Sequence, residues 1–177
     1  RQAMGFAKQK LESWREKTKD QKKARMVQLH GYLSTEHFLY DEKGYGYFTN
    51  FEKSRLGSPI QDLLPYLSRH LKTRPKRSEE AVDWVSMYLN YFPLKEDERL
   101  LFLSYLAYPT GLLRTAEAYH MQKTKLDERK YVQRLQRHYW HLKNTEYVAM
   151  RLEEIEQQKQ AAIAEAKRQA EQEGAQS

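Results

Sequence analysis

Two short segments hold the side chains whose types and spacing could support chemistry. Residues 30–37 contain Tyr32 and His37, and residues 50–52 begin with Asn50, twenty positions after His30. A tyrosine is a poor base near neutral pH because its unperturbed pKa is about 10. Histidine and asparagine are neutral ligands, whereas a hard Mg²⁺ ion prefers anionic oxygen. None of these three side chains is a carboxylate, the type of group that metal-dependent chemistry uses as a base and as a Mg²⁺ ligand.

A β-hairpin is the element expected to position these segments. Residues 33–40 and 45–51 are rich in aromatic side chains, and the sequence Asp-Glu-Lys-Gly at 41–44 separates them. Gly44 is free to take the positive φ that such turns require. We expect this hairpin to be the only clear strand pair in the chain.

Apolar residues recurring every three or four positions predict helices in the remainder. The expected helical ranges are 3–14, 59–71, 81–89, 96–108, 111–120 and 131–142. The lysine-rich stretch before Val27 is either a loop or an exposed helix, and residues 73–78, with Pro75, are expected to form a loop. After Met150 the composition shifts to Glu, Gln, Ala and Lys, which predicts a polar helix that frays toward Gly174. We therefore expect a helical domain over residues 1–150 and a polar helical tail over residues 151–177.

Composition restricts the class of protein. The 177 residues contain no cysteine, which excludes disulfides and thiolate metal sites. No apolar run approaches the roughly 18 residues needed to cross a membrane. The formal net charge is +7, and a basic field often serves nucleic-acid binding. The densest basic runs read as solvated helix faces and loops; they comprise Lys17, Lys19, Lys22, Lys23 and Arg25, and then Lys72, Arg74, Lys76 and Arg77.

A pair of histidines is the remaining candidate for metal binding. His138 and His141 lie three residues apart on an expected helix and therefore share a face. A metal site would need a third ligand and supporting hydrogen bonds, and no carboxylate is placed convincingly beside them. We expect neither a metal nor another cofactor.

The two motif segments resemble those of the aminoglycoside-phosphotransferase-like kinases. In that family the first segment reads His-Gly-Asp with an Asn five residues later, and the second carries an Asp ahead of a Glu. The resemblance places Tyr32 at the catalytic Asp, His37 at the metal-binding Asn and Asn50 at the metal-binding Asp. His30, Gly31 and Glu52 match the family pattern. The resemblance therefore implies a kinase-like fold without kinase activity.

Two retained residues are expected to serve the scaffold. In this family the motif histidine is largely structural, so we expect His30 to be buried and hydrogen-bonded. The stretch 56–63 resembles the family segment that opens the central helix, where an Asp accepts backbone N–H bonds from the catalytic loop. Asp62 occupies that position, and a carboxylate at a helix start also gains about 0.3–1 kcal/mol from the helix dipole. An opportunistic catalytic role for Asp62 or Glu52 remains an alternative.

The C-terminal third narrows the resemblance. The stretches 93–98, 106–109 and 112–114 resemble the helical tail of the spore-coat kinase-like proteins of endospore-forming bacteria, in particular the YutH type. The resemblance covers residues 11 to 139. It implies the C-terminal lobe of a longer protein, made in the mother-cell cytoplasm and then held in the spore coat. It also implies spore-coat proteins as partners.

Three hypotheses follow from the sequence. The first is a catalytically degenerate, kinase-like structural or binding component of the spore coat, mainly α with one short hairpin and without an N-terminal lobe. The second is a divergent small-molecule phosphotransferase that uses Glu36, Glu52 or Asp62 in new roles. The third is a small basic helical module that binds nucleic acid with an affinity that falls steeply with salt.

Overall fold

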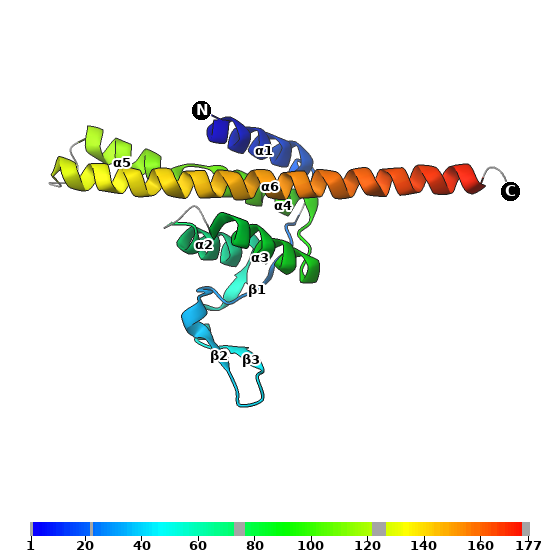
Figure 1. The fold of residues 1–177 in the computed structure, drawn as a ribbon, viewed down its shortest axis with the longest axis horizontal. Coiled ribbons are helices and arrows are strands. Elements are labelled where there is room, and N and C mark those ends of the chain that lie inside the picture. Colours follow the sequence, from blue (N-terminus) through cyan, green and yellow to red (C-terminus); the bar gives the residue numbers. More distant parts are fainter. Residues whose placement is uncertain (1, 22, 73–76, 122–126, 175–177) are drawn as a thin grey trace.

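The described part of the chain is mainly helical. The structure, a computed structural model, describes residues 2–21, 23–72, 77–121 and 127–174. Over these residues it contains six α-helices and two antiparallel strand pairs (Figure 1). The helices are α1 (Gln2–Thr18), α2 (Ile60–His70), α3 (Arg77–Tyr91), α4 (Glu96–Ala107), α5 (Thr110–His120) and α6 (Glu128–Gly174). The mainly α class expected from the sequence is confirmed.

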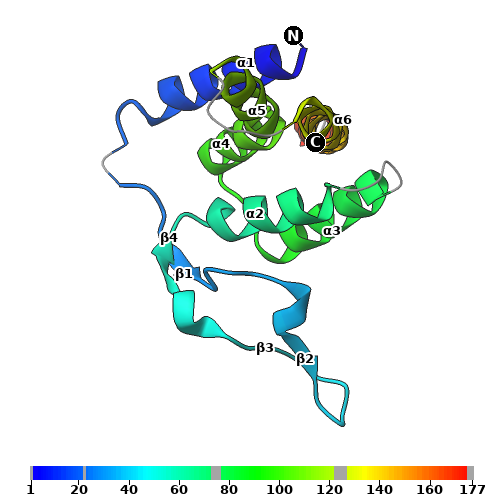
Figure 2. The ribbon, with the colours of Figure 1, turned by 90° about the vertical axis from the view of Figure 1, so that its left-hand side faces the viewer.

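The core lies where α4 and α6 meet the other helices. Figure 2 looks along α6 and shows it beside α4 and α5 and above α2 and α3. The largest fully buried side chains include Phe102 of α4, Leu67 of α2, Val85 of α3 and Val148 of α6. Helix α4 is buried on nearly every side, with α1 packed along it. A helix that is apolar around most of its circumference belongs in such a central position.

Helix α6 is much longer than the sequence pattern predicts. It runs without interruption for 47 residues, so the change in composition at Met150 falls inside it. The segment contains no proline, and no glycine before Gly174, so nothing in it breaks a helix. The helix continues as far as Gly174, the residue toward which fraying is expected. None of the helices in the described ranges is long and apolar enough to cross a membrane.

Two strand pairs carry the segment between α1 and α2. Strands β2 (Phe38–Tyr40) and β3 (Gly46–Phe48) form the predicted hairpin. In its turn Gly44 has φ +82°, and the Asp41 carboxylate accepts the Tyr45 N–H at 2.8 Å. The second pair, β1 (Val27–Leu29) with β4 (Arg55–Gly57), brackets the hairpin and was not predicted.

The basic stretches fall largely outside regular structure. Residues 19–21 and 23–26 have no helix or strand, which decides between the two alternatives for this stretch in favour of a loop. Lys22, Arg74 and Lys76 lie outside the described residues, as does most of the expected loop at 73–78. The last two residues of that range already belong to α3.

An ion-pair network ties α1 and α6 to α4. The carboxylate of Glu153 on α6 accepts hydrogen bonds from Lys10 Nζ at 2.5 Å and Arg99 Nη1 at 2.9 Å. Burial alone would raise the pKa of Glu153, but the hydrogen bonds and charges of Lys10 and Arg99 outweigh it and lower the pKa. This network therefore stabilises the fold at pH values above the ordinary range of a carboxyl pKa. The stabilisation is lost as the pH falls and Glu153 takes up a proton.

Candidate functional site

A carboxylate on α2 holds the loop that follows β1. Asp62, in the first turn of α2, accepts the His30 N–H at 2.7 Å through Oδ2 and the Gly31 N–H at 2.9 Å through Oδ1. Both carboxylate oxygens are therefore committed to the backbone. These are the contacts that the sequence resemblance implies for this position.

Gly31 is required where this loop passes the next segment. Its φ is +84°, and a Cβ at this position would lie 1.9 Å from the carbonyl oxygen of Lys53. Lys53 ends a short 3₁₀ helix, η2 (Phe51–Lys53). Only glycine combines this backbone conformation with this close approach.

His30 connects the loop to the segment after β3. Its side chain is buried, and its Nε2 lies 2.8 Å from the carbonyl oxygen of Thr49, to which it donates. The ring also packs on Phe51, with centroids 4.6 Å apart, and meets the edge of Phe48. The expectation of a buried, hydrogen-bonded His30 is confirmed.

Tyr32, His37 and Asn50 come together in the structure. The carbonyl oxygen of Tyr32 lies 3.1 Å from Nδ1 of His37, and Nδ2 of Asn50 lies 3.0 Å from Nε2 of the same ring. Because a carbonyl can only accept, Nδ1 carries the proton and Nε2 accepts from the asparagine amide. Asn50 reaches the ring from a left-handed backbone conformation, with φ +63°. Both ring nitrogens of His37 are thus occupied, and neither offers a lone pair to a metal.

Two cations lie against the phenol ring of Tyr32. The Lys53 ammonium lies 4.9 Å and the Arg69 guanidinium 5.0 Å from the ring centroid. Arg69 also donates to the carbonyl oxygen of Leu33, which fixes its position. A cation–aromatic cluster therefore occupies the place where the resemblance puts a catalytic carboxylate.

The remaining carboxylates do not form a metal centre. Glu36 and Glu52 are exposed, and both oxygens of Asp62 are used by the loop. Within the described ranges, no group of three or more histidine, aspartate or glutamate side chains could hold a metal ion. The structure thus brings together Tyr32, His37 and Asn50 but adds no acidic group to them.

The cations around Tyr32 were missed at the level of sequence. Arg69 lies seven residues after Asp62, two turns further along the same face of α2. Helical periodicity could therefore have placed Arg69 beside the motif loop. Lys53 follows Glu52 directly, but nothing in the sequence indicates that its side chain turns back over Tyr32.

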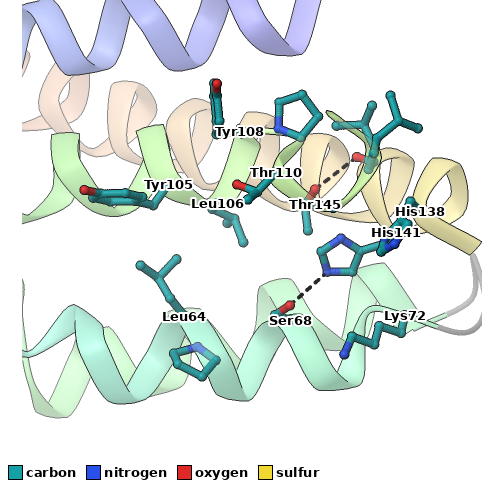
Figure 3. A pocket seen from close by; sticks show the side chains of 15 residues that line it. Leu64, Ser68, Lys72, Tyr105, Leu106, Tyr108, Thr110, His138, His141 and Thr145 are labelled. Atoms are coloured by element: carbon teal, nitrogen blue, oxygen red, sulfur yellow. Dashed lines mark hydrogen bonds between the residues drawn. The ribbon is translucent and has the colours of Figure 1, made fainter. Parts of the chain in front are cut away.

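His138 and His141 line a second site. They project from α6 into a cavity of about 400 Å³ bounded by α2 and by the turn from α4 into α5 (Figure 3). His141 Nε2 lies 3.3 Å from the Ser68 hydroxyl across this cavity. Burial, followed by the charge of Lys72, lowers the pKa of His141. Burial, followed by Arg134 and Arg137, lowers the pKa of His138. The expected shared face is confirmed.

The structure is that of a mainly helical protein in which the Asp62 carboxylate holds the loop after β1. In the first site, His37 forms hydrogen bonds with the Tyr32 carbonyl and with Asn50. No protein-family model, curated protein or solved structure matches the chain.

Proposed function

We propose that this chain is the C-terminal lobe of a kinase-like protein without phosphotransfer activity, serving as a structural or binding component of the bacterial spore coat. The observation that supports a kinase-like lobe without phosphotransfer activity is the hydrogen bonding of His37. Both of its ring nitrogens are used by Tyr32 and Asn50. The side chains of His37 and Asn50 are therefore bound to each other, and His37 is also held by the backbone carbonyl of Tyr32.

The charge of this site is also unsuited to phosphoryl transfer. That reaction depends on metal ions that bridge the phosphates and on a carboxylate that orients the nucleophile. Here Lys53 and Arg69 flank Tyr32, and no carboxylate faces it in the positions that the motif provides. The site lacks both the anionic oxygens that hold Mg²⁺ and a base that works near neutral pH.

The scaffold around the altered positions is intact, which supports a retained fold with lost chemistry. Asp62 holds the loop through two backbone N–H groups, and His30 ties it to Thr49. Strands β1 and β4 bracket the hairpin, so both motif segments emerge side by side. Such an arrangement is what we expect of a phosphotransferase-like site whose reactive groups have been replaced.

A thermal-shift titration with nucleotide tests the loss of chemistry. The chain is expected to show no change in melting temperature with millimolar ATP, ADP and Mg²⁺, since a ligand that binds the native state must raise it. The triple variant Tyr32→Asp, His37→Asn, Asn50→Asp restores the family residues and is expected to gain a Mg²⁺-dependent rise. A Mg²⁺-dependent shift of the unmodified chain would contradict the proposal. Failure of the folded triple variant to bind Mg²⁺ would show that these positions are not a former metal site.

Exposed aromatic side chains on the hairpin provide the surface for a coat partner. Leu39, Tyr40, Tyr45 and Tyr47 are all more than half exposed, and Figures 1 and 2 show the hairpin extending away from the helices. Exposed apolar surface of this kind marks interaction sites on otherwise polar proteins. The coat assignment itself is supported by the sequence resemblance.

Localisation in a sporulating endospore-forming bacterium tests the proposed role in the spore coat. A fluorescent fusion of the chain is expected to form a ring around the forespore. The substitutions Tyr40→Ser and Tyr47→Ser together are expected to disperse that ring into the mother cell. Tyr91→Ser is the matched control, because Tyr91 is even more exposed than Tyr40 and Tyr47 but lies at the end of α3. Diffuse fluorescence of the unmodified fusion would contradict a role in the coat.

A further inference from the structure

The cavity beside His138 and His141 is separate from the hairpin site and has its own chemical character. Three elements enclose it: α2, the α4–α5 turn and the N-terminal part of α6 (Figure 3). Its volume of about 400 Å³ lies within the range of small-molecule sites in proteins. None of its residues takes part in the Tyr32, His37 and Asn50 cluster.

The ionisable side chains of this cavity, apart from the phenols of Tyr105 and Tyr108, are all basic. Lys72 enters at the end of α2, and His138 and His141 enter from α6. No aspartate or glutamate belongs to the residues that line the cavity, and within the described ranges Lys72 forms no ion pair. Arg134 and Arg137 add further positive charge near His138. The electrostatic potential in the cavity therefore favours an anion.

The rest of the lining is apolar or carries hydroxyl groups. Leu64, Leu106 and Leu142 provide apolar surface from three different helices, and Ser68 and Thr110 add hydroxyls. In Figure 3 the imidazole of His141 points across the cavity toward Ser68, with Lys72 below it and Leu64 and Leu106 to the side. A ligand that fits this surface has a small charged head and a short apolar body.

We propose that this cavity binds a small amphiphilic anion, a carboxylate or a phosphate monoester with a short apolar chain, through Lys72, His138 and His141. The headgroup lies among the three basic side chains, and the chain lies against Leu64, Leu106 and Leu142. Ser68, whose hydroxyl lies 3.3 Å from His141 Nε2, is placed to donate a hydrogen bond to the head.

Binding of such an anion is coupled to proton uptake. In the free protein the pKa of His138 is lowered by burial and then by the charges of Arg134, Arg137 and Lys72. The pKa of His141 is lowered by burial and then by the charges of Lys72 and His138. From the α4–α5 side, the titratable groups that line the cavity, within the described residues, are the phenols of Tyr105 and Tyr108. An anion between the histidines offsets this positive field and raises both pKa values. The affinity therefore increases as the pH falls.

Titration of the whole chain with hexanoate and with hexyl phosphate tests the proposal. Saturable binding is expected for at least one of them, and the difference between them identifies the preferred head. NMR of the imidazole carbon-bound protons, assigned with His138→Gln and His141→Gln, is expected to show that the anion raises the pKa of both rings. Hexanoate is expected to bind more tightly at about pH 6 than at about pH 7.5, because its own carboxyl stays ionised over this range.

Matched controls separate this site from general charge attraction. Hexylammonium has the same apolar chain with the opposite charge and is expected not to bind. Lys72→Gln is expected to weaken binding about tenfold, as loss of a charge-assisted contact does. Lys167→Gln, an exposed substitution far along α6, removes the same charge and is expected to have no effect. Absence of saturable binding, equal binding of hexylammonium, or an unchanged affinity of the folded Lys72→Gln protein would overturn the proposal.

Discussion

Replacing Asp62 with alanine is expected to lower the free energy of unfolding by about 3 kcal/mol. The substitution removes two charge-assisted hydrogen bonds, to the N–H groups of His30 and Gly31. Hydrogen bonds to a charged group contribute roughly 1.5–3 kcal/mol each, and a part-buried donor left without a partner adds a desolvation cost. The two amides lie in a loop pressed against Lys53, so they cannot turn to another acceptor without moving the backbone. Urea unfolding followed by circular dichroism measures the change.

Two control variants make this result specific. Asp62→Asn keeps the shape but replaces one accepting oxygen with a donor, so it is expected to lose one of the two bonds and to cost less than alanine. Asp83→Ala removes an exposed carboxylate from α3 and is expected to change stability by less than about 0.5 kcal/mol. Amide hydrogen exchange at His30 and Gly31 is expected to accelerate in Asp62→Ala alone. Equal stability of Asp62→Ala and Asp83→Ala would show that the loop does not depend on this carboxylate.

Replacing Glu98 with alanine is expected to be at least as damaging, by about 3–5 kcal/mol, which is the range for breaking a buried ion pair. Glu98 is buried near the start of α4 and accepts two hydrogen bonds from Arg25, at 2.8 Å and 2.6 Å. It also accepts the N–H of Lys95 at 2.8 Å, which caps the helix. The Arg25 guanidinium packs on the ring of Phe92. Loss of Glu98 therefore leaves a part-buried cation without its partner and an uncapped helix end.

A double-mutant cycle isolates the pair. Arg25→Ala together with Glu98→Ala is expected to cost less than the sum of the two single substitutions, because each single variant strands the other charge. The matched control is Glu96→Ala, two residues before Glu98, which removes an exposed partner of Lys17. It is expected to cost less than about 1 kcal/mol. Additive behaviour of the Arg25 and Glu98 substitutions would show that the two side chains do not stabilise the fold as a pair.

The sequence predicts the helices and the hairpin of this fold well because each depends on a pattern of neighbouring residues. The hairpin follows from aromatic runs around a turn, and Gly44 takes the positive φ expected of it. Strands β1 and β4 were missed because three residues are too few to display an alternating pattern. The continuity of α6 was missed because a change in composition was taken as a boundary, although nothing near Met150 interrupts a helix.

The site is predictable only as far as it rests on individual residues. The anchoring role of Asp62 and the burial of His30 follow from the motif resemblance and are found in the structure. The bonding of His37 to both Tyr32 and Asn50 depends on the left-handed backbone at Asn50, which no side-chain pattern indicates. The basic cavity requires α2 and α6 to lie together, and that is a property of tertiary packing.

The length of α6 has a consequence for how the molecule moves in solution. At 1.5 Å per residue its 47 residues span about 70 Å, whereas a compact chain of this size has a radius of gyration of only about 16 Å. Positions 161–172 are all exposed, so the last part of this length, about 20 Å, carries no packed neighbour. Viscous drag on this arm slows end-over-end tumbling far more than spinning about the helix axis. The molecule therefore rotates as a rod with a globular body at one side, and whatever binds the tip of the arm is held at a distance from the hairpin.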